Sequence, residues 1–248
     1  MISVMQPTLF PWLGYFDLID QSDIFVFYTD VQFSKQSWQT RNRISTKNGI
    51  MLFSIPTLKC DLNTNIENVF IDTNNLWNKK FLKTLKYNYV NSKHFTEIIG
   101  WFNEFLSREF LSLQEINITF IQEVSEKIGI NTVFKKSSDL NIENSDRIER
   151  LIEIGTLHDA NTYLSTIGSF QYLDGENAME RFLNNHIQIL FHHYHPMQYN
   201  TGKLPYEPYM SIIDVLFNCG FDETLAIIRA GRKPNFSFEE YKMLQDAK

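Results

Sequence analysis

The sequence has little cysteine and no long apolar run. Its 248 residues include two cysteines, Cys60 and Cys219, at no metal-binding spacing. A fold built on disulfides is therefore excluded, and we expect reduced thiols. The apolar runs are a few residues long, far below the roughly 18 that a membrane span requires. The first residues also lack the basic and apolar segments of a signal peptide, so we expect a cytoplasmic protein with no membrane span.

The sequence also lacks an excess of positive charge. It has 23 Lys and Arg against 29 Asp and Glu, a formal net charge of −6. Affinity for nucleic-acid backbones requires many basic side chains acting together, which excludes a general nucleic-acid-binding protein. An anionic ligand must instead be bound by a local cluster. Aromatic residues make up 15% of the chain, which suits either a well-filled core or surfaces that stack on a ring-containing ligand.

The first 30 residues have the pattern of a βαβ unit. Residues 2–6 and 24–28 are short apolar runs typical of buried strands, and 14–21 has helical apolar spacing. Such a unit predicts a right-handed crossover and a parallel sheet whose ligands bind at the carboxyl ends of the strands. We therefore expect residues 6–11 and 28–32 to lie at the site.

The rest of the chain shows no internal repeat and no low-complexity linker. Residues 51–55, 66–71, 132–134 and 187–191 have strand patterns, and 145–154, 211–217 and 223–228 have helical patterns. Between them, residues of about 75–130 predict long helices that form a helical insert or subdomain. We expect one α/β domain over 1–248, a Rossmann-like, mostly parallel sheet with a helical insert.

A basic and aromatic cluster follows the second predicted strand. In an extended conformation Arg41 and Arg43 project on the same side, and Asn42 on the other. Two forked guanidiniums suit a pyrophosphate, and Trp38 could stack on a base or sugar, with Lys35 nearby. The alternative is a solvated β-ribbon with surface ion pairs.

Three further places could hold catalytic groups. His195 follows a predicted strand and could act as a general base, because a neutral imidazole accepts a proton near pH 7. Its neighbour His193 has no acidic or thiol partner at a metal-binding spacing, so no metal ligands are assigned. Ser165 lies in a tight loop with Gly168 but not in a nucleophile elbow. Asp214, within an apolar helix, needs a partner for its charge or contacts a ligand.

The chain resembles the WbqC-like family of bacterial O-antigen and capsular polysaccharide biosynthesis proteins. The matching N-terminal positions are Met5, Gln6, Pro7, Phe10, Pro11, Gly14, Tyr15, Phe16, Asp30, Val31, Gln32, Lys35, Trp38, Arg41, Asn42 and Ile44. Later likenesses include Tyr163, Leu164, Ser165, Gly168, Tyr172, Leu173, Pro196, Gln198 and residues 211–220. At Thr166 the family usually has glycine, which puts an anion-binding turn there in doubt.

The resemblance implies that the gene lies in an O-antigen or capsule cluster, together with genes for enzymes that make dideoxy-amino sugars. We expect an acyl- or aminoacyltransferase that forms an amide on the amine of a nucleotide-linked, dTDP type, sugar. Its co-substrate would be a thioester of coenzyme A or of an acyl or peptidyl carrier protein, with no tightly bound cofactor. A carrier could dock on the helix face of Lys79, Lys83 and Lys86, which could equally be a solvated face.

Each expected role has named candidates. Arg41, Arg43 and Lys35 would bind the diphosphate, and His195 or Asp30 would accept the amine proton. Ser165 or a loop NH group would stabilise the oxyanion. Other expected substrate contacts are Gln6, Tyr15, Gln32, Trp38, Asn42 and Asp214. One alternative is a nucleotidyl-transferring or adenylate-forming enzyme, since the first loop has the place of a nucleotidylyltransferase HxGH motif without its histidines. The other is a non-catalytic binding protein of the pathway.

Overall fold

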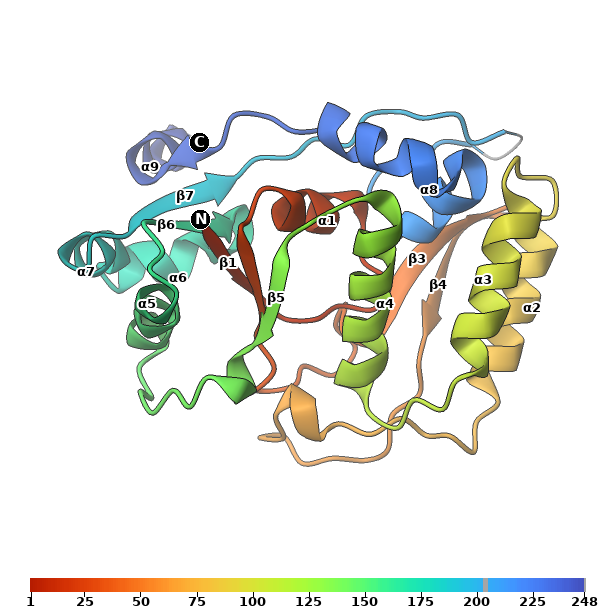
Figure 1. Cartoon of the computed structure of the whole chain (residues 1–248), viewed down its shortest axis with the longest axis horizontal. Helices are drawn as coiled ribbons and strands as arrows, with labels where there is room; N and C mark the ends of the chain where they lie inside the picture. Colours follow the sequence, from red (N-terminus) through yellow and green to blue (C-terminus); the bar gives the residue numbers. More distant parts are fainter. Residues whose placement is uncertain (203–204, 248) are drawn as a thin grey trace.

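The computed structural model describes residues 1–202 and 205–247. At its centre is a six-stranded sheet of order β5-β2-β1-β6-β7-β8 (Figure 1). The first five of these strands are parallel, and β8 pairs antiparallel at one edge. The strands are β1 (Ile2–Met5), β2 (Ile24–Phe27), β5 (Val133–Lys136), β6 (Thr162–Thr166), β7 (Gln188–His192) and β8 (Phe236–Ser237). The predicted α/β fold with a mostly parallel sheet is confirmed.

The order of the strands reverses beside β1. From β1 the chain proceeds outward through β2 to β5, and then returns to β6 on the opposite side of β1. The topological switch point therefore lies between β1 and β6. In open parallel sheets the crevice outside the carboxyl ends of the strands at this point is where ligands bind.

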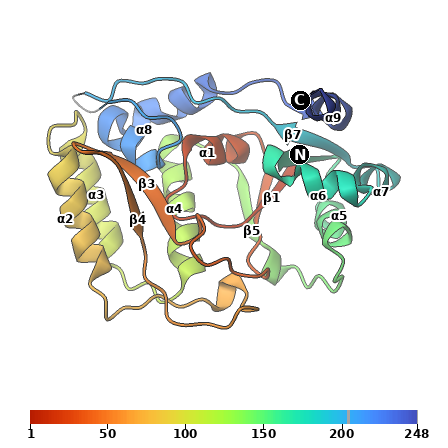
Figure 2. The same cartoon turned by 180° about the vertical axis from the view of Figure 1, so that it is seen from behind.

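Helices cover both faces of the sheet (Figures 1 and 2). One face carries α1 (Leu13–Asp20), α4 (Leu113–Ile128) and α8 (Ile212–Ala230), and the other carries α5 (Arg147–Leu157), α6 (Phe170–Gly175), α7 (Ala178–Asn184) and α9 (Phe238–Asp246). The strands alternate between these layers, so that Phe25 and Phe27 enter one core cluster and Val26 the other. Two-sided burial explains why the parallel strands are apolar on both sides. No helix in the described ranges is both long and apolar enough to cross a bilayer.

A long excursion separates β2 from β5. It contains an antiparallel ribbon of β3 (Arg41–Thr46) and β4 (Gly49–Ser54), then α2 (Trp77–Tyr89), α3 (Phe95–Ser107) and α4. In Figure 1 the ribbon and helices α2 and α3 lie at the opposite end of the molecule from α5 and α7. Residues of these helices share one hydrophobic cluster with α1 and with the sheet.

The predicted strand at 66–71 is wrong. Its first part is a 3-10 turn, Ile66–Asn68, and its last two residues form only isolated bridges, Phe70 to Ser112 and Ile71 to Thr57. The polar pair Glu67 and Asn68 interrupts the apolar run, so the segment lacks the continuous apolar face of a buried strand. Its first two backbone NH groups instead bond to the loop after β2, with Ile66 N 3.0 Å from the Val31 carbonyl and Glu67 N 3.1 Å from that of Thr29.

The loop between β1 and α1 passes through the middle of the aromatic core. Phe10 has a left-handed backbone conformation, with φ of 43°, and its side chain is completely buried. Its ring contacts those of Phe53, Phe81, Phe102, Phe105 and Phe120. A bulky residue rarely adopts positive φ, so the surrounding contacts must hold this loop in place.

Buried polar side chains from distant segments hold the carbonyl groups of this loop. The Asn42 amide, on β3, donates to the carbonyls of Leu9 at 2.8 Å and Phe10 at 3.0 Å. The Ser211 hydroxyl, which caps α8, donates to the Phe10 carbonyl at 2.6 Å. Asn117, on α4, donates to a further carbonyl of the loop at 3.2 Å. The loop therefore joins the ribbon, α4 and α8 to the end of β1.

Replacing Asn42 with alanine should destabilise the protein by about 2 kcal/mol, because the Leu9 carbonyl loses its side-chain donor and the Phe10 carbonyl loses one of two. Urea denaturation of both proteins measures the difference. The control is Asn103→Ala, at an exposed position of α3, which should change the free energy of unfolding by less than about 0.5 kcal/mol. Equal effects of the two substitutions would contradict the proposed role of Asn42.

Candidate functional site

A cleft of about 840 Å³ lies at the carboxyl ends of β1, β2 and β6, at the topological switch point. Four of the residues singled out from the sequence line it together: Gln6, Asp30, Gln32 and Ser165. Gln6 and Asp30 follow β1 and β2, and Ser165 is near the end of β6. They meet because parallel strands present their carboxyl ends at the same edge of a sheet.

Asp30 is held in place by two donors. The Arg150 guanidinium and the Ser137 hydroxyl bond to separate carboxylate oxygens of Asp30, and a fifth of the Asp30 side chain is exposed. Arg150 also donates from Nε to the Tyr28 hydroxyl at 3.1 Å. Burial opposes the charge on Arg150, but its bonds to Tyr28 and Asp30 raise its pKa overall. Asp30 is therefore a fixed carboxylate in a partly shielded ion pair.

Arg147 lies one turn before Arg150 at the start of α5, and both line the cleft. The Arg147 guanidinium carbon is 3.5 Å from the centre of the Tyr172 ring, a cation–π contact. No acidic side chain of the described residues forms an ion pair with Arg147. With two arginines and one aspartate, the cleft wall has an excess of positive charge in an acidic protein.

The sequence contained a signal for these two arginines. The predicted helix at 145–154 follows a predicted strand at 132–134, and the start of such a helix lies at the carboxyl edge of a parallel sheet. Two arginines spaced i and i+3 in that first turn share one side of the helix. The sequence pattern favours Arg41 and Arg43 for the anion-binding role instead, because they follow an earlier predicted strand.

Ser165 has its hydroxyl committed within the cleft wall. Its Oγ is 2.6 Å from that of Ser169, and Ser169 donates to the Thr166 carbonyl at 2.6 Å. Because Ser169 has one proton to give, Ser165 donates to Ser169. None of the described residues that line the cleft is a histidine, so Ser165 has no adjacent base to activate it as a nucleophile.

A second, smaller pocket of about 260 Å³ adjoins the cleft, and Met5 lines both. Four more of the predicted residues line this pocket: Tyr15, Trp38, Asn42 and Arg43. The Tyr15 hydroxyl donates to the Gln6 carbonyl at 3.1 Å, and burial raises the pKa of Tyr15 well above its ordinary value. The two compartments thus share the end of β1 as a common wall.

The remaining predicted residues line neither compartment. Lys35 is exposed, with Nζ 3.3 Å from the Cys60 carbonyl, and Arg41 is partly buried on β3. His195 is exposed beyond β7, where its backbone NH bonds to the Gly231 carbonyl at 2.9 Å. The structure therefore brings none of these three side chains to the cleft.

Asp214 also lies elsewhere, in the first turn of α8, and is completely buried. It accepts hydrogen bonds from the hydroxyls of Tyr89 at 2.8 Å and Tyr199 at 2.7 Å. Burial raises the pKa of Asp214, although the bonds from the two tyrosines oppose the shift. Its contacts join α8 to α2 and to the segment after β7.

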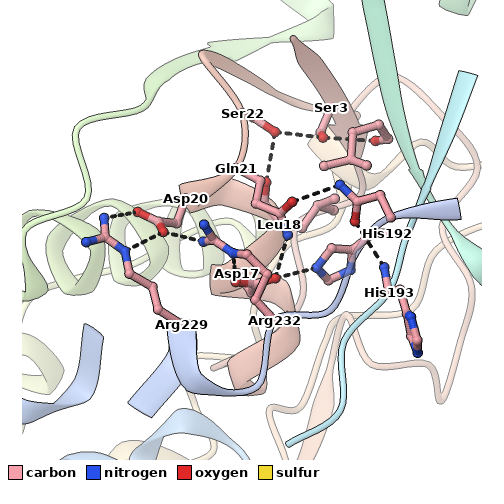
Figure 3. Close-up of polar contacts among 12 residues, drawn as sticks. Ser3, Asp17, Leu18, Asp20, Gln21, Ser22, His192, His193, Arg229 and Arg232 are labelled. Carbon is pink, nitrogen blue, oxygen red and sulfur yellow. Dashed lines mark hydrogen bonds and ion pairs between the residues drawn. The ribbon is translucent and has the colours of Figure 1, made fainter. Parts of the chain in front are cut away.

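At the end of β7 it is His192, rather than His195, that meets an acidic side chain (Figure 3). The fully buried Asp17 of α1 lies 2.7 Å from His192 Nε2 and accepts from Arg232 Nε at 2.8 Å. Asp20 accepts from Arg229 Nε at 2.8 Å and also from Arg232. This cluster fixes α1 between β7 and the end of α8, and its members line neither compartment.

Asp20→Asn should destabilise the protein at neutral pH, and the loss should shrink in acid. Burial alone would raise the pKa of Asp20, but hydrogen bonds from Arg229 and Arg232 lower it overall. A carboxyl group whose pKa is lower in the native state than in the unfolded state stabilises the protein at pH values above its unfolded-state pKa. This stabilisation is lost as the pH falls through the native-state pKa. We expect a larger difference in unfolding free energy between wild type and variant at about pH 7 than at about pH 3.

Urea denaturation at both pH values measures these differences. The control is Asp222→Asn, an exposed position of α8, which should change stability little at either pH. An equal loss for Asp20→Asn at both pH values would show that its charge is not what stabilises the cluster.

Comparison with known proteins identifies relatives over most of the chain. The profile of the WbqC-like protein family matches residues 6–226. An uncharacterized protein of Mycobacterium tuberculosis, Rv1507c, is 30% identical over 221 residues, which cover 88% of this chain and 94% of that relative. No solved structure matches the chain.

Proposed function

The chain belongs to the WbqC-like protein family, and from this premise and the geometry of the cleft we propose that it acylates or aminoacylates a nucleotide-linked amino sugar. The product is an amide on the sugar amine, the nucleotide is of the dTDP type, and the pathway makes surface polysaccharide. The donor is a thioester of coenzyme A or of a carrier protein. The observation that carries the proposal is the cleft at the switch point, with Arg147 and Arg150 in its wall.

The arginines support an anionic, ring-containing substrate. Each guanidinium can donate paired, charge-assisted hydrogen bonds to phosphate oxygens. Arg147 is the freer of the two, because Arg150 is bonded to Asp30 and Tyr28. Arg147 therefore binds the diphosphate, and Arg150 mainly positions Asp30.

Amide formation requires a group that accepts a proton from the amine. The thiol of the donor is the leaving group. The amine nitrogen attacks the thioester carbon, the new C–N bond replaces the C–S bond, and the thiol leaves with a proton. Asp30 is the one carboxylate among the described residues of the cleft. It holds the ammonium group and receives its proton, a role for which His195 lies in the wrong place.

The side-chain amide of Gln6, which lines the same cleft as Asp30, stabilises the tetrahedral intermediate. The Gln6 Oε1 accepts from the Gln39 amide at 2.8 Å, which orients the Gln6 side chain and leaves its own NH₂ group to donate in the cleft. A fixed donor directed at the developing oxyanion lowers the barrier most, because it needs no rearrangement during the reaction.

A carrier protein, where it is the donor, docks on α2. Lys79, Lys83 and Lys86 are exposed on this helix, opposite its buried residues Phe81 and Leu85. The helix contains no acidic residue, so its outer face attracts an acidic surface.

The deciding experiment incubates the protein with dTDP-linked 4-amino sugars and with acyl or aminoacyl thioesters of coenzyme A and of a carrier protein. We expect a product with the mass of the N-acylated sugar nucleotide and one equivalent of free thiol. Asp30→Asn should lower kcat at least about a hundredfold, the scale of general acid–base catalysis. Pyrophosphate release from ATP or CTP with magnesium, without amide product, would favour a nucleotidyl-transferring or adenylate-forming enzyme instead. The absence of both reactions would favour a non-catalytic binding protein.

Arg147→Ala should raise the KM for the sugar nucleotide roughly tenfold, with a smaller effect on kcat, because it removes a charge-assisted bond to the diphosphate. The control is Arg108→Ala, whose guanidinium pairs with Glu123 at the end of α3, and steady-state kinetics should not change. An unchanged KM for Arg147→Ala would remove the diphosphate from this part of the cleft.

A further inference from the structure

The smaller pocket beside the cleft has mostly aromatic walls. Its lining includes the rings of Trp12, Tyr15, Trp38 and Tyr209, and the guanidinium of Arg43 is its one charged group among the described residues. Nearly half of the Trp38 side chain is exposed, at 48%. Exposed aromatic faces with one fixed polar group are the usual composition of a site for a flat ring.

Arg43 has an unused donor in this wall. Its guanidinium lies over the Trp38 ring, 5.3 Å from the ring centre, and its Nη2 donates to the Tyr209 carbonyl at 3.3 Å. The Nε–H is buried, and no described residue accepts from it. A buried donor without an acceptor is rare in folded proteins, and here it belongs to a side chain of the pocket wall.

The position of the Trp12 indole depends on Gly14. A Cβ atom added at Gly14 would lie 2.3 Å from Cη2 of Trp12, so the indole packs directly on the backbone of α1. The Tyr194 ring also contacts the indole, edge-on, with centres 5.5 Å apart. This wall of the pocket is therefore fixed before any ligand binds.

Tyr209 has a backbone conformation that side chains rarely adopt, with φ of 61°, although 44% of its side chain is exposed. Its ring centre lies 5.2 Å from that of Trp12. Strained residues of this kind occur preferentially at ligand sites, where the surrounding structure holds them. Because nearly half of the Tyr209 side chain is exposed, its burial stabilises the fold little. We infer that the strained backbone is kept because it holds this ring in the pocket wall.

We propose that this pocket binds the pyrimidine base of the nucleotide, with the ring against the aromatic walls and the Arg43 guanidinium donating to a ring carbonyl. The identity of the ligand as a nucleotide rests on the proposed function. The sizes agree, because about 260 Å³ suits the smaller ring and about 840 Å³ leaves space for the sugar and diphosphate. Thymine and uracil offer carbonyl oxygens to Arg43, whereas adenine offers only ring nitrogens as acceptors, so we expect the pocket to favour pyrimidine over adenine nucleotides.

Isothermal titration calorimetry with dTDP, ADP and inorganic pyrophosphate tests this pocket without the transfer reaction. Wild-type protein should bind dTDP at least about tenfold more tightly than ADP. Trp38→Ala and Arg43→Met should each weaken dTDP roughly tenfold and leave pyrophosphate unchanged, since a lost stacking or hydrogen-bond contact acts on the base alone. Arg147→Ala should weaken both ligands, and the control Arg108→Met neither.

Tyr209→Asn provides a variant that keeps the fold. Asparagine tolerates positive φ far better than most residues, so thermal denaturation should show an unchanged Tm while dTDP binding weakens. The proposal is overturned if dTDP binds no more tightly than ADP, if wild-type protein binds no dTDP, or if the pocket variants weaken pyrophosphate as much as dTDP. Selective dTDP binding without any amide product would instead contradict the proposed reaction and support the base pocket.

Discussion

The fold depends on one constraint, the fixed path of the loop from β1 to α1 through the aromatic core. Phe10 occupies this path with positive φ, and its carbonyl accepts from both Asn42 and Ser211. Each donor comes from a segment distant in sequence. The loop therefore fixes the positions of the ribbon and α8 relative to the sheet. The same loop borders both compartments of the site, because Gln6 lines the cleft and Thr8 and Pro11 line the smaller pocket.

Charge is distributed unevenly over this frame. The formal net charge is −6, yet the acids that lie deepest have local partners: Asp17 pairs with Arg232, and Asp214 accepts hydrogen bonds from two tyrosines. Such buried groups need partners because removal from water is costly. Arg147 is the opposite case, a guanidinium at the cleft with no described acidic partner, and this local imbalance is what suits the cleft to an anion.

The sequence predicted the parts of the site that depend on local pattern. Gln6 and Asp30 follow apolar runs whose period identifies them as strands, and the edge where strands end was therefore predictable. The start of the helix after the predicted strand at 132–134 indicates that Arg150 lies at this edge, but its meeting with Asp30 depends on the pairing of β5 with β2, a long-range contact. The histidine run shows the same limit: β7 ends at His192, whose ring meets Asp17 of α1, while His195 turns away beside Gly231.

The two compartments draw their walls from different parts of the chain. Arg147 and Arg150 belong to α5, which packs on the sheet, whereas Trp38 and Arg43 belong to the excursion between β2 and β5. If the smaller pocket binds the base, recognition of the base and of the diphosphate are structurally separable. Substitutions in the ribbon would then change the preferred base while the arginines on α5 kept their positions, because the two walls belong to different elements.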